Sequence, residues 1–323
     1  HGFNAVVVDV KDDWGMLTYT SQLDLHTRYG AVRGLFDLQT LVKKAHEHGI
    51  EVIGRMVVFK DKLLYHAEGY DYAVWDPRSE APWGHEVERK NPDTGETEYV
   101  QREFWVDPFS EEVWDYNIDI AEELQSLGID EVQFDYIRFP SDGEVNSIEY
   151  RHRRQGMNKT EAIESFLKKV RQTVHIPVSA DLYGFNSWYR MGNWIGQDIE
   201  MLSHYVDVIC PMFYPSHFPS TFLSDLGYIA RAHRIYREGT LRARTITEGR
   251  SSIRPYVQAF LMGGELSMEQ PEYERYLNRQ IEGTYQGGGS GYTLWNNMNR
   301  YYMVNSRVGA LNDERSKEPE TDT

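Results

Sequence analysis

The sequence predicts an α/β fold, a TIM (β/α)8 barrel, and three observations support this prediction. Short runs rich in Val and Ile alternate along the chain with longer stretches of helical periodicity. The short runs are mostly apolar on both faces, which is typical of parallel strands covered on two sides. A barrel of eight units in about 250 residues fits this spacing. An open doubly wound sheet fits less well, because the glycine-rich phosphate loop is absent.

Seven of the eight expected strands are recognisable. They cover residues 3–10, 51–59, 131–139, 176–184, 205–214, 254–261 and 291–296. One strand of an eight-stranded barrel is then unaccounted for.

Five helices are expected, at residues 35–49, 110–128, 158–174, 220–239 and 270–288. Ser110 is the expected N-cap of the second helix, and Asn158 or Thr160 that of the third. Gly128 follows the second helix as its stop signal. Pro271 stands in the first turn of the last helix, where proline is tolerated.

The chain is expected to form one catalytic barrel domain over residues 1–305, followed by a disordered acidic tail over residues 306–323. Residues 60–109 are too many for an ordinary connection between a strand and a helix. A Pro-Asp-Thr-Gly turn within them, flanked by alternating residues, predicts a β-hairpin that acts as a lid. The tail is polar and charged and has no apolar periodicity.

Charge and composition exclude some classes of function. The chain has 34 Lys and Arg against 50 Asp and Glu, a net charge of −16 that would repel the phosphates of nucleic acid. No apolar run reaches the roughly 18 residues that a membrane-spanning helix needs. The single cysteine, Cys210, cannot form an internal disulfide and is expected to be buried.

Polar and aromatic residues gather at the carboxyl ends of the predicted strands, which face the active site in a (β/α) barrel. Carboxylates bind and activate sugar hydroxyls, and aromatic rings cover the apolar faces of pyranose rings. The mixture therefore indicates a carbohydrate site. The candidate substrate-binding residues are Asp9, Lys11, Arg55, Arg138, Tyr183, Tyr214, His217, Gln258, Trp295 and Asn296.

Asp135 and Asp181 are the candidate catalytic residues, because they end consecutive predicted strands. Neighbouring strands lie about 5 Å apart, close to the separation of the two carboxyl groups in a retaining glycosidase. Arg138 or Arg55 would keep one carboxylate ionised, and a drier environment would keep the other protonated as the acid. An acid in so apolar a strand costs several kcal/mol unless it is paired or used.

Several candidates also have a purely structural interpretation. Asp9 would then only hold Lys11 or a loop N–H group, and Arg55 would pair with a strand-end aspartate. Asp12 and Asp13 would lie in a solvated loop. Together with Asp9 they leave open a cation site, and with it a metal-dependent hydrolase. We assign no metal ligand and expect no redox cofactor.

Several stretches resemble a known family. They are "GFNAVVVDVKDDWG", "EVIGRMVVF", "DEVQFDYIRFPSDG", "VSADLYGF", "DVICPMFYPSHF" and "GYTLWN", spread over residues 1–305. The chain resembles the bacterial "putative glycoside hydrolase" family, which is assigned to the α-amylase-like TIM barrels. The resemblance implies hydrolysis of O-glycosidic bonds in a polysaccharide or oligosaccharide.

The resemblance also implies an order of strands. Another strand and helix precede the first block in this family, so the missing strand would lie upstream of His1. Strand four would then end in Asp135 as nucleophile, and strand five in Asp181 as acid. The chain departs from amylases twice: the acid is Asp where they have Glu, and strand seven offers only Gln258 where they have a third acid.

The departure at Gln258 leaves a second interpretation open, a catalytically inactive barrel that binds glycan with its aromatic residues. Loss of turnover with retained sugar binding, on substitution of Asp135 and Asp181, separates an enzyme from such a barrel. In both cases we expect a glycan as the partner, a monomeric protein, and a location outside the cell or in the bacterial cell envelope.

Overall fold

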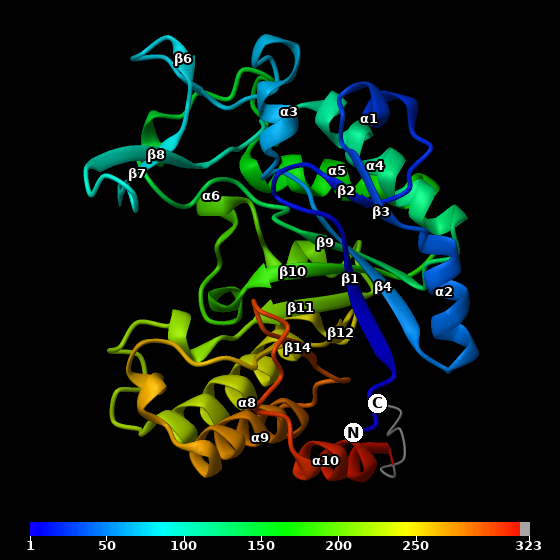
Figure 1. Ribbon diagram of the computed structural model, residues 1–323, viewed down its shortest axis with the longest axis vertical. Helices are drawn as coiled ribbons and strands as arrows, with labels where there is room; N and C mark the ends of the chain where they lie inside the picture. The colour runs from blue at the N-terminus through cyan, green and yellow to red at the C-terminus, as the bar shows by residue number, and fades with distance from the viewer. Residues whose placement is uncertain (317–323) are drawn as a thin grey trace. The chain divides into compact units, whose positions relative to one another are not determined.

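A computed structural model describes residues 1–316 and divides the chain into two compact units. The N-terminal unit comprises Ala5–Val178 and Met191–Gln197, and the C-terminal unit comprises His1–Asn4, Ser179–Arg190 and the chain from Asp198 onward. Both units combine parallel strands with helices, as the labels in Figure 1 show, so the predicted mixed α/β fold is confirmed.

Five strands form the sheet of the N-terminal unit. β1 pairs in parallel with β4, β4 with β9, and β2 with β3. β1 meets β2 antiparallel at a single position, where Lys11 lies opposite Leu17. In spatial order the strands are β3 (Val32–Phe36), β2 (Leu17–Tyr19), β1 (Ala5–Lys11), β4 (Glu51–Val57) and β9 (Glu131–Asp135).

The long helices of the N-terminal unit begin at capping residues. The side chain of Ser110 accepts a hydrogen bond from the N–H of Val113, and Asn158 forms a capping box with Glu161. The helices are α1 (Asp24–Arg28), α2 (Leu38–Glu47), α3 (Lys62–His66), α4 (Glu111–Ser126), α5 (Lys159–Thr173) and α6 (Gly192–Ile195), with 3-10 turns η1 (Ala67–Gly69) and η2 (Val145–Ser147).

Helices α4 and α5 cover one face of β4 and β9. A Cβ atom at Gly54 would lie 3.4 Å from Leu124 Cδ1, so α4 approaches β4 closely there. Phe134 packs edge-on against Phe166 of α5, with ring centroids 5.5 Å apart. Alternate residues of a strand point to opposite faces. Asp135 therefore points away from these helices, on the polar face of the sheet.

The segment between β4 and α4 contains short antiparallel pairs. β5 (Trp75–Asp76) pairs with β6 (Ala81–Pro82), and β7 (His85–Lys90) pairs with β8 (Thr97–Glu103). The Asn91 side chain accepts hydrogen bonds from two N–H groups of the turn between β7 and β8. A hairpin thus occupies the segment, and its action as a lid stays a prediction.

The strands of the C-terminal unit are all parallel. In spatial order they are β10 (Val178–Tyr183), which enters this unit at its second residue, β11 (Val208–Met212), β13 (Tyr256–Gln258) and β14 (Thr293–Trp295), with β12 (Ser252–Ile253) beside β11. The helices are α7 (Ile199–Leu202), α8 (Tyr228–Thr247), α9 (Gln270–Gln286) and α10 (Ser306–Ser316), with 3-10 turns η3 (Gly184–Ser187), η4 (Pro215–His217) and η5 (Gly263–Ser267).

Helix α8 differs from the predicted helix over 220–239. It begins at Tyr228 and continues to Thr247, past the glycine that ends the predicted segment. A Cβ atom at Gly239 would come within 2.7 Å of the rings of Phe213 and Trp188. The glycine is therefore explained by close packing inside the helix and does not end it.

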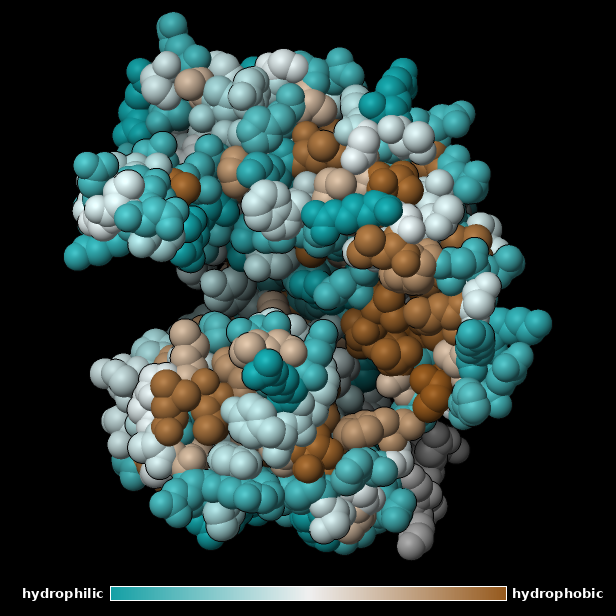
Figure 2. Space-filling model, in the orientation of Figure 1, coloured by the Kyte–Doolittle hydropathy of each residue, from teal (hydrophilic) through white to brown (hydrophobic). Residues whose placement is uncertain are grey.

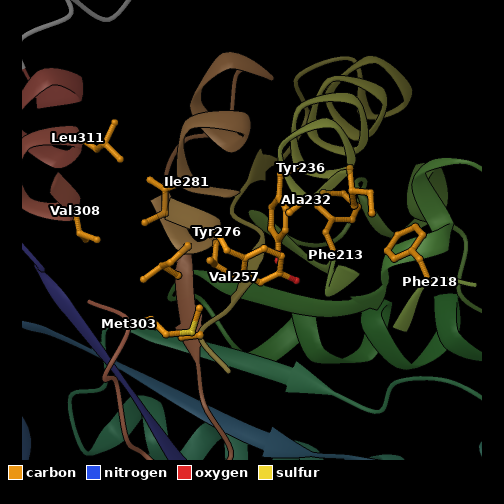
Figure 3. Close-up of a cluster of buried hydrophobic side chains, with 13 residues drawn as sticks. Phe213, Phe218, Ala232, Tyr236, Val257, Tyr276, Ile281, Met303, Val308 and Leu311 are labelled. Atoms are coloured by element: carbon orange, nitrogen blue, oxygen red, sulfur yellow. The ribbon is translucent and has the colours of Figure 1, made fainter. Parts of the chain in front are cut away.

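A hydrophobic core fills the C-terminal unit between its strands and helices α8, α9 and α10 (Figure 3). Val308 and Leu311 of α10 belong to this core. Residues 306–316 are therefore helical where a disordered tail is expected, because two buried apolar residues fix them to the core. The rest of the expected tail, residues 317–323, lies outside the described residues.

Strand β1 is covered less completely than the two-sided burial expected from its composition. Apolar side chains gather over β1 on the face seen in Figure 2, and Val6 is 41% exposed.

The next residues along the chain, 17–36, form β2, α1 and β3, none of which is expected from the sequence. Of these, β3 lies at the edge of the sheet.

Candidate functional site

An ion cluster joins the carboxyl ends of β1, β4 and β9 in the N-terminal unit. Arg55 donates from Nη1 to Asp9 Oδ1 at 2.6 Å and from Nε to Asp135 Oδ2 at 3.1 Å, and its Nη2 also contacts Asp135 Oδ2. The strand register places Asp9 opposite Arg55, and Asp135 opposite Val57 two residues further along β4. The structure thus brings together three residues that the sequence nominates.

Both carboxylate oxygens of Asp135 have hydrogen-bond donors. Oδ2 accepts from Arg55, and Oδ1 accepts from the backbone N–H of Tyr136 at 2.7 Å. Asp135 is 5% exposed, whereas the side chain of Asp9 is 63% exposed. Charge-assisted bonds of this kind stabilise an ionised carboxylate. Asp135 is therefore the buried member of the cluster, and Asp9 is the outermost.

Tyr136 follows Asp135 in a left-handed backbone conformation. Its φ of +53° is uncommon for a residue with a bulky side chain and marks a constrained turn at the end of β9. Its ring centroid lies 5.2 Å from Lys60 Nζ and 5.0 Å from Arg138 Cζ. Burial, and then the negative charge of Asp135, raise the pKa of Tyr136, so its hydroxyl stays protonated near neutral pH.

The two cations beside Tyr136 are themselves anchored. Lys60 Nζ lies 3.4 Å from Asp13 Oδ2 and 3.3 Å from Glu103 Oε1. The guanidinium of Arg138 lies 4.9 Å from the ring centroid of Trp105 and donates to the carbonyl of the next residue at 3.0 Å. Sequence reasoning nominated Arg138 but missed Lys60, which lies in the segment after β4 and not at a strand end.

Lys11 does not join this cluster. It is fully buried, and its Nζ contacts Val57 O at 2.7 Å, Asn117 Oδ1 at 3.1 Å and Asp61 Oδ2 at 2.7 Å. Val57 O and Asn117 Oδ1 accept hydrogen bonds from the ammonium group, and Asp61 forms an ion pair with it. The register between β1 and β4 shifts between Asp9 and Lys11, and such irregularities redirect side chains. The structure therefore gives Lys11 a structural contact set in place of the expected substrate contact.

Asp181 and Tyr183 lie on β10 in the C-terminal unit. Parallel pairing with β11 places Asp181 opposite Cys210 and Tyr183 opposite Met212. Asp181 is 1% exposed, and Tyr183 is partly exposed. Asp135 and Asp181 thus belong to different units, and their action as a pair stays a prediction.

An aromatic group forms in the C-terminal unit around Tyr214 and Trp295. Their rings stack with centroids 5.6 Å apart and 28° between the planes. Phe260 packs edge-on against both rings, at 5.8 Å and 5.3 Å. The ring of His217, an exposed residue, lies 5.3 Å from that of Tyr214. The structure thus gathers three nominated residues and adds Phe260, which sequence reasoning missed.

Gln258 and Asn296 are buried and hold the loops that carry the aromatic group. Gln258 Nε2 donates to Glu265 Oε2 at 2.7 Å, and Gln258 Oε1 accepts from the N–H of Ser216 at 3.1 Å. Asn296 Nδ2 donates to Ala259 O at 2.7 Å, and its Oδ1 accepts from two N–H groups of the following turn. These contacts give both amides a positioning role and not the expected direct contact with substrate.

Glu265 is a buried carboxylate that sequence reasoning missed. It is 2% exposed, and its Oε1 accepts from the hydroxyl of Tyr276 at 2.7 Å. Its Oε2 accepts from Gln258 Nε2 at 2.7 Å and from the N–H of Met262 at 3.1 Å. Glu265 lies in a 3-10 turn seven residues after β13 ends, so no strand-end pattern marks it.

Two absences hold for residues 1–316. No group of three or more His, Cys, Asp or Glu side chains there has the geometry to hold a metal ion. One oxygen of Asp12 accepts from the N–H groups of Trp14 and Met16. In the same part of the chain, no helix combines the length and apolarity needed to cross a bilayer.

Comparison with protein families decides the assignment. The family described as "Putative glycosyl hydrolase domain" matches residues 1–301. The chain belongs to this family. The match includes both acids and the strand ends described above. No curated protein matches the chain.

Solved structures similar to this family member include glycoside hydrolases. The PgaB (BpsB) glycoside hydrolase domain from Bordetella bronchiseptica is 15% identical, with a TM-score of 0.59 and coverage of 96% of this chain and 88% of that one. The chitinase RmChi1 from Rhizomucor miehei is 11% identical, with a TM-score of 0.51 and coverage of 96% and 93%. A hypothetical protein from Ruminiclostridium thermocellum ATCC 27405 is 33% identical, with a TM-score of 0.46 and coverage of 56% and 84%. The first two show a shared fold, which is consistent with a TIM-like barrel.

Proposed function

We propose that this chain hydrolyses O-glycosidic bonds in a polysaccharide or oligosaccharide, with Asp135 as nucleophile or general base and Asp181 as general acid. The family and the fold support a glycoside hydrolase. The observation that carries the assignment of Asp135 is its buried carboxylate at the carboxyl end of β9, held by Arg55 and by the N–H of Tyr136. Substrates of (β/α) barrel enzymes bind at this end of the strands.

The chemistry follows from the two carboxyl groups. Asp181 would give its proton to the glycosidic oxygen as the bond to the anomeric carbon breaks. Asp135 would attack that carbon directly, or take a proton from a water molecule that attacks it. Water supplies the new hydroxyl group at the anomeric carbon in both cases. Arg55 bonds to Asp135 through Nε and Nη2 and would fix the orientation of the attacking oxygens.

The substrate-binding part of the proposal assigns further roles. Asp9, Arg55, Arg138 and Tyr183 would bind sugar hydroxyls, and Tyr214 and Trp295 would lie against the apolar face of a sugar ring. Trp295 is partly exposed whereas Tyr214 is buried, so Trp295 is the more accessible of the two rings. We place the protein outside the cell or in the bacterial cell envelope, as a monomer.

The finer fold proposal is a closed (β/α)8 barrel, in which a further parallel strand would lie beside β1. Among residues 1–316, β1 pairs with β4 along its length but with β2 only at Lys11. The rest of its second edge is able to accept a parallel strand. An experimental structure in which a strand pairs with Ala5–Val10 along this edge would support this proposal, and one in which that edge stays unpaired would contradict it.

The experiment is a screen of glycans for released reducing ends, followed by substitution of the two acids. We expect Asp135→Asn and Asp181→Asn each to lower kcat/KM by at least about 100-fold, with an unchanged circular dichroism spectrum. Asp115→Asn changes an exposed aspartate of α4, the helix that covers the opposite face of the sheet from Asp135, and serves as the matched control. Wild-type rates in both site variants would disprove the assignment.

A catalytically inactive glycan-binding barrel is the second candidate. Gln258 favours this candidate. It stands at the end of β13, the seventh strand of the proposed barrel, and its side-chain amide is hydrogen-bonded to Glu265 and Ser216. Glycan binding by calorimetry without any released reducing ends, in the wild type as in both acid variants, would select this alternative.

A further inference from the structure

The orientation of the Gln258 side-chain amide is fixed by two partners that only accept hydrogen bonds. Nε2 lies 2.7 Å from Glu265 Oε2 and 3.0 Å from the carbonyl oxygen of Phe260. Only the NH2 end of the amide can satisfy a carboxylate and a carbonyl together. Gln258 Oε1 therefore faces Ser216, whose backbone N–H donates to it at 3.1 Å.

Glu265 and Gln258 are themselves held from α9. The Tyr276 hydroxyl donates to Glu265 Oε1 at 2.7 Å. Gln280 bonds to the backbone of Gln258 through both ends of its side-chain amide. Gln280 Oε1 accepts from the N–H of Gln258 at 2.9 Å, and Gln280 Nε2 donates to the carbonyl of Gln258 at 3.2 Å. All four side chains are buried. The acceptor that Gln258 presents to Ser216 is thus rigidly placed.

The single hydroxyl proton of Ser216 has two neighbours. Oγ lies 2.9 Å from Gln258 Oε1 and 3.0 Å from His217 Nδ1. If the hydroxyl donated to His217, Oγ and Oε1 would face each other at 2.9 Å with no proton between them. If it donates to Gln258, a proton on Nδ1 can bond to Oγ, and each contact then contains one proton.

We infer that Gln258 and Ser216 hold neutral His217 as its Nδ1–H tautomer, so that Nε2 is a hydrogen-bond acceptor for a sugar hydroxyl. The partner of one ring nitrogen determines the state of the other. His217 is an exposed residue at the end of η4, so part of its side chain is accessible to a ligand. Partial burial of its ring lowers the pKa of His217, which keeps the imidazole neutral near neutral pH.

The surroundings of the ring indicate the class of ligand. Its centroid lies 5.3 Å from that of Tyr214 and 6.4 Å from that of Phe260, and Tyr214 stacks on Trp295. An acceptor at the margin of an aromatic group matches a pyranose, which offers hydroxyl donors around an apolar C–H face. This identification of the ligand rests on the proposed function, whereas the tautomer does not. Gln258 and Ser216 are positioning residues, and His217 is the residue that contacts the ligand.

The tautomer is tested on the full chain labelled with 15N at histidine, by long-range 1H–15N correlation near neutral pH. In the wild type we expect a protonated Nδ1 and an unprotonated Nε2 for His217. Ser216→Ala removes the acceptor of Nδ1–H, and Gln258→Leu leaves the serine hydroxyl able to donate to Nδ1. Both variants should therefore shift His217 toward the Nε2–H tautomer.

His233 provides an internal reference in the same spectra, because its Nε2 contacts Gln286 Oε1 at 2.9 Å, remote in sequence from both substitutions. An unchanged His233 signal shows that a variant is folded, and the His217 signal is assigned by its loss in His217→Gln. An Nε2–H tautomer in the wild type overturns the inference, as does an unchanged tautomer in a folded Ser216→Ala variant.

The ligand is tested with the glycan that the screen identifies. Loss of one hydrogen-bond acceptor should raise KM about 5- to 30-fold in His217→Ala. His217→Gln, which retains a side-chain acceptor, should recover part of this loss. An unchanged KM in His217→Ala overturns the sugar-hydroxyl assignment. If no glycan is hydrolysed, the proposed function fails, and the tautomer is still decided by the spectra.

Discussion

Lys11 Nζ lies 2.7 Å from Asp61 Oδ2, and both side chains are fully buried. The pair links the carboxyl end of β1 to α3, because Asp61 Oδ1 also accepts from the N–H of Leu64 and caps that helix. Removal of one member of a buried ion pair leaves the other charged and unpaired, which is strongly destabilising. The stability of the N-terminal unit should therefore depend on this pair.

We expect Lys11→Met to lower the free energy of unfolding by about 3–5 kcal/mol, measured by urea denaturation. Asp61→Asn retains an oxygen that can cap α3 and removes the unpaired charge. The double variant should therefore be more stable than Lys11→Met alone. If Lys11→Met were as stable as the wild type but bound glycan more weakly, the result would contradict this structural role. It would instead support the substrate contact expected from the sequence.

The two ends of the Arg55 cluster should differ in their contribution to stability. Arg55→Met leaves buried Asp135 without its cation and should lower the free energy of unfolding by about 3 kcal/mol or more. Asp9→Asn alters the exposed end of the same cluster, and surface ion pairs contribute about 0–1 kcal/mol. Urea denaturation of both variants measures the contrast. Equal losses would show that the buried and exposed contacts are not energetically distinct.

The strand pattern was predictable because it depends on local composition. β-branched and aromatic residues concentrate where strands are buried, and all seven predicted strands are present. The end of α8 was not predictable, since Gly239 owes its place to the rings of Phe213 and Trp188 from elsewhere in the chain. Helix α10 was missed for a similar reason: only the core shows that Val308 and Leu311 are buried.

Part of the candidate site was also predictable from the sequence. Asp135 and Arg55 stand at strand ends, and parallel pairing brings their side chains together. Lys11 lies at a strand end as well, but a register shift in β1 directs it to other partners. Glu265 acquires its partners through a turn beyond β13. A residue's place at a strand end predicts which other strand-end residues lie near it. Bulges and turns then determine which of these side chains are buried.

His26 gives a pH dependence of stability that can be measured directly. It is fully buried in α1, stacks on Tyr116 with centroids 3.9 Å apart, and has Nε2 3.0 Å from the carbonyl of Tyr116. Burial is the main cause that lowers its pKa to about 4, with a smaller contribution from the charge of Lys11. The unfolded chain takes up this proton near the ordinary value of about 6.5.

Between these two pKa values the unfolded state binds more protons than the folded state, so stability falls as the pH falls. We expect a loss of up to about 3 kcal/mol from this residue over that range, and none above it. His26→Gln retains a donor for Tyr116 O but does not titrate. Urea denaturation as a function of pH should give a flatter profile for the variant, and parallel profiles would contradict the assignment.

Helices α8 and α9 pack against each other (Figure 1), so a small substitution between them should change the free energy of unfolding markedly. A Cβ atom at Gly283 of α9 would lie 2.5 Å from the carbonyl oxygen of His233 in α8. Ala is the better helix former, by about 1 kcal/mol, but the two backbones would have to separate. We expect Gly283→Ala to lower the free energy of unfolding by about 1–3 kcal/mol.

Gly227→Ala is the matched control, because Gly227 precedes α8 with nothing within 4 Å of the added methyl group and an ordinary φ of −68°. Its effect in urea denaturation should stay within about 1 kcal/mol, and equal effects for both variants would show that the helices separate at little cost.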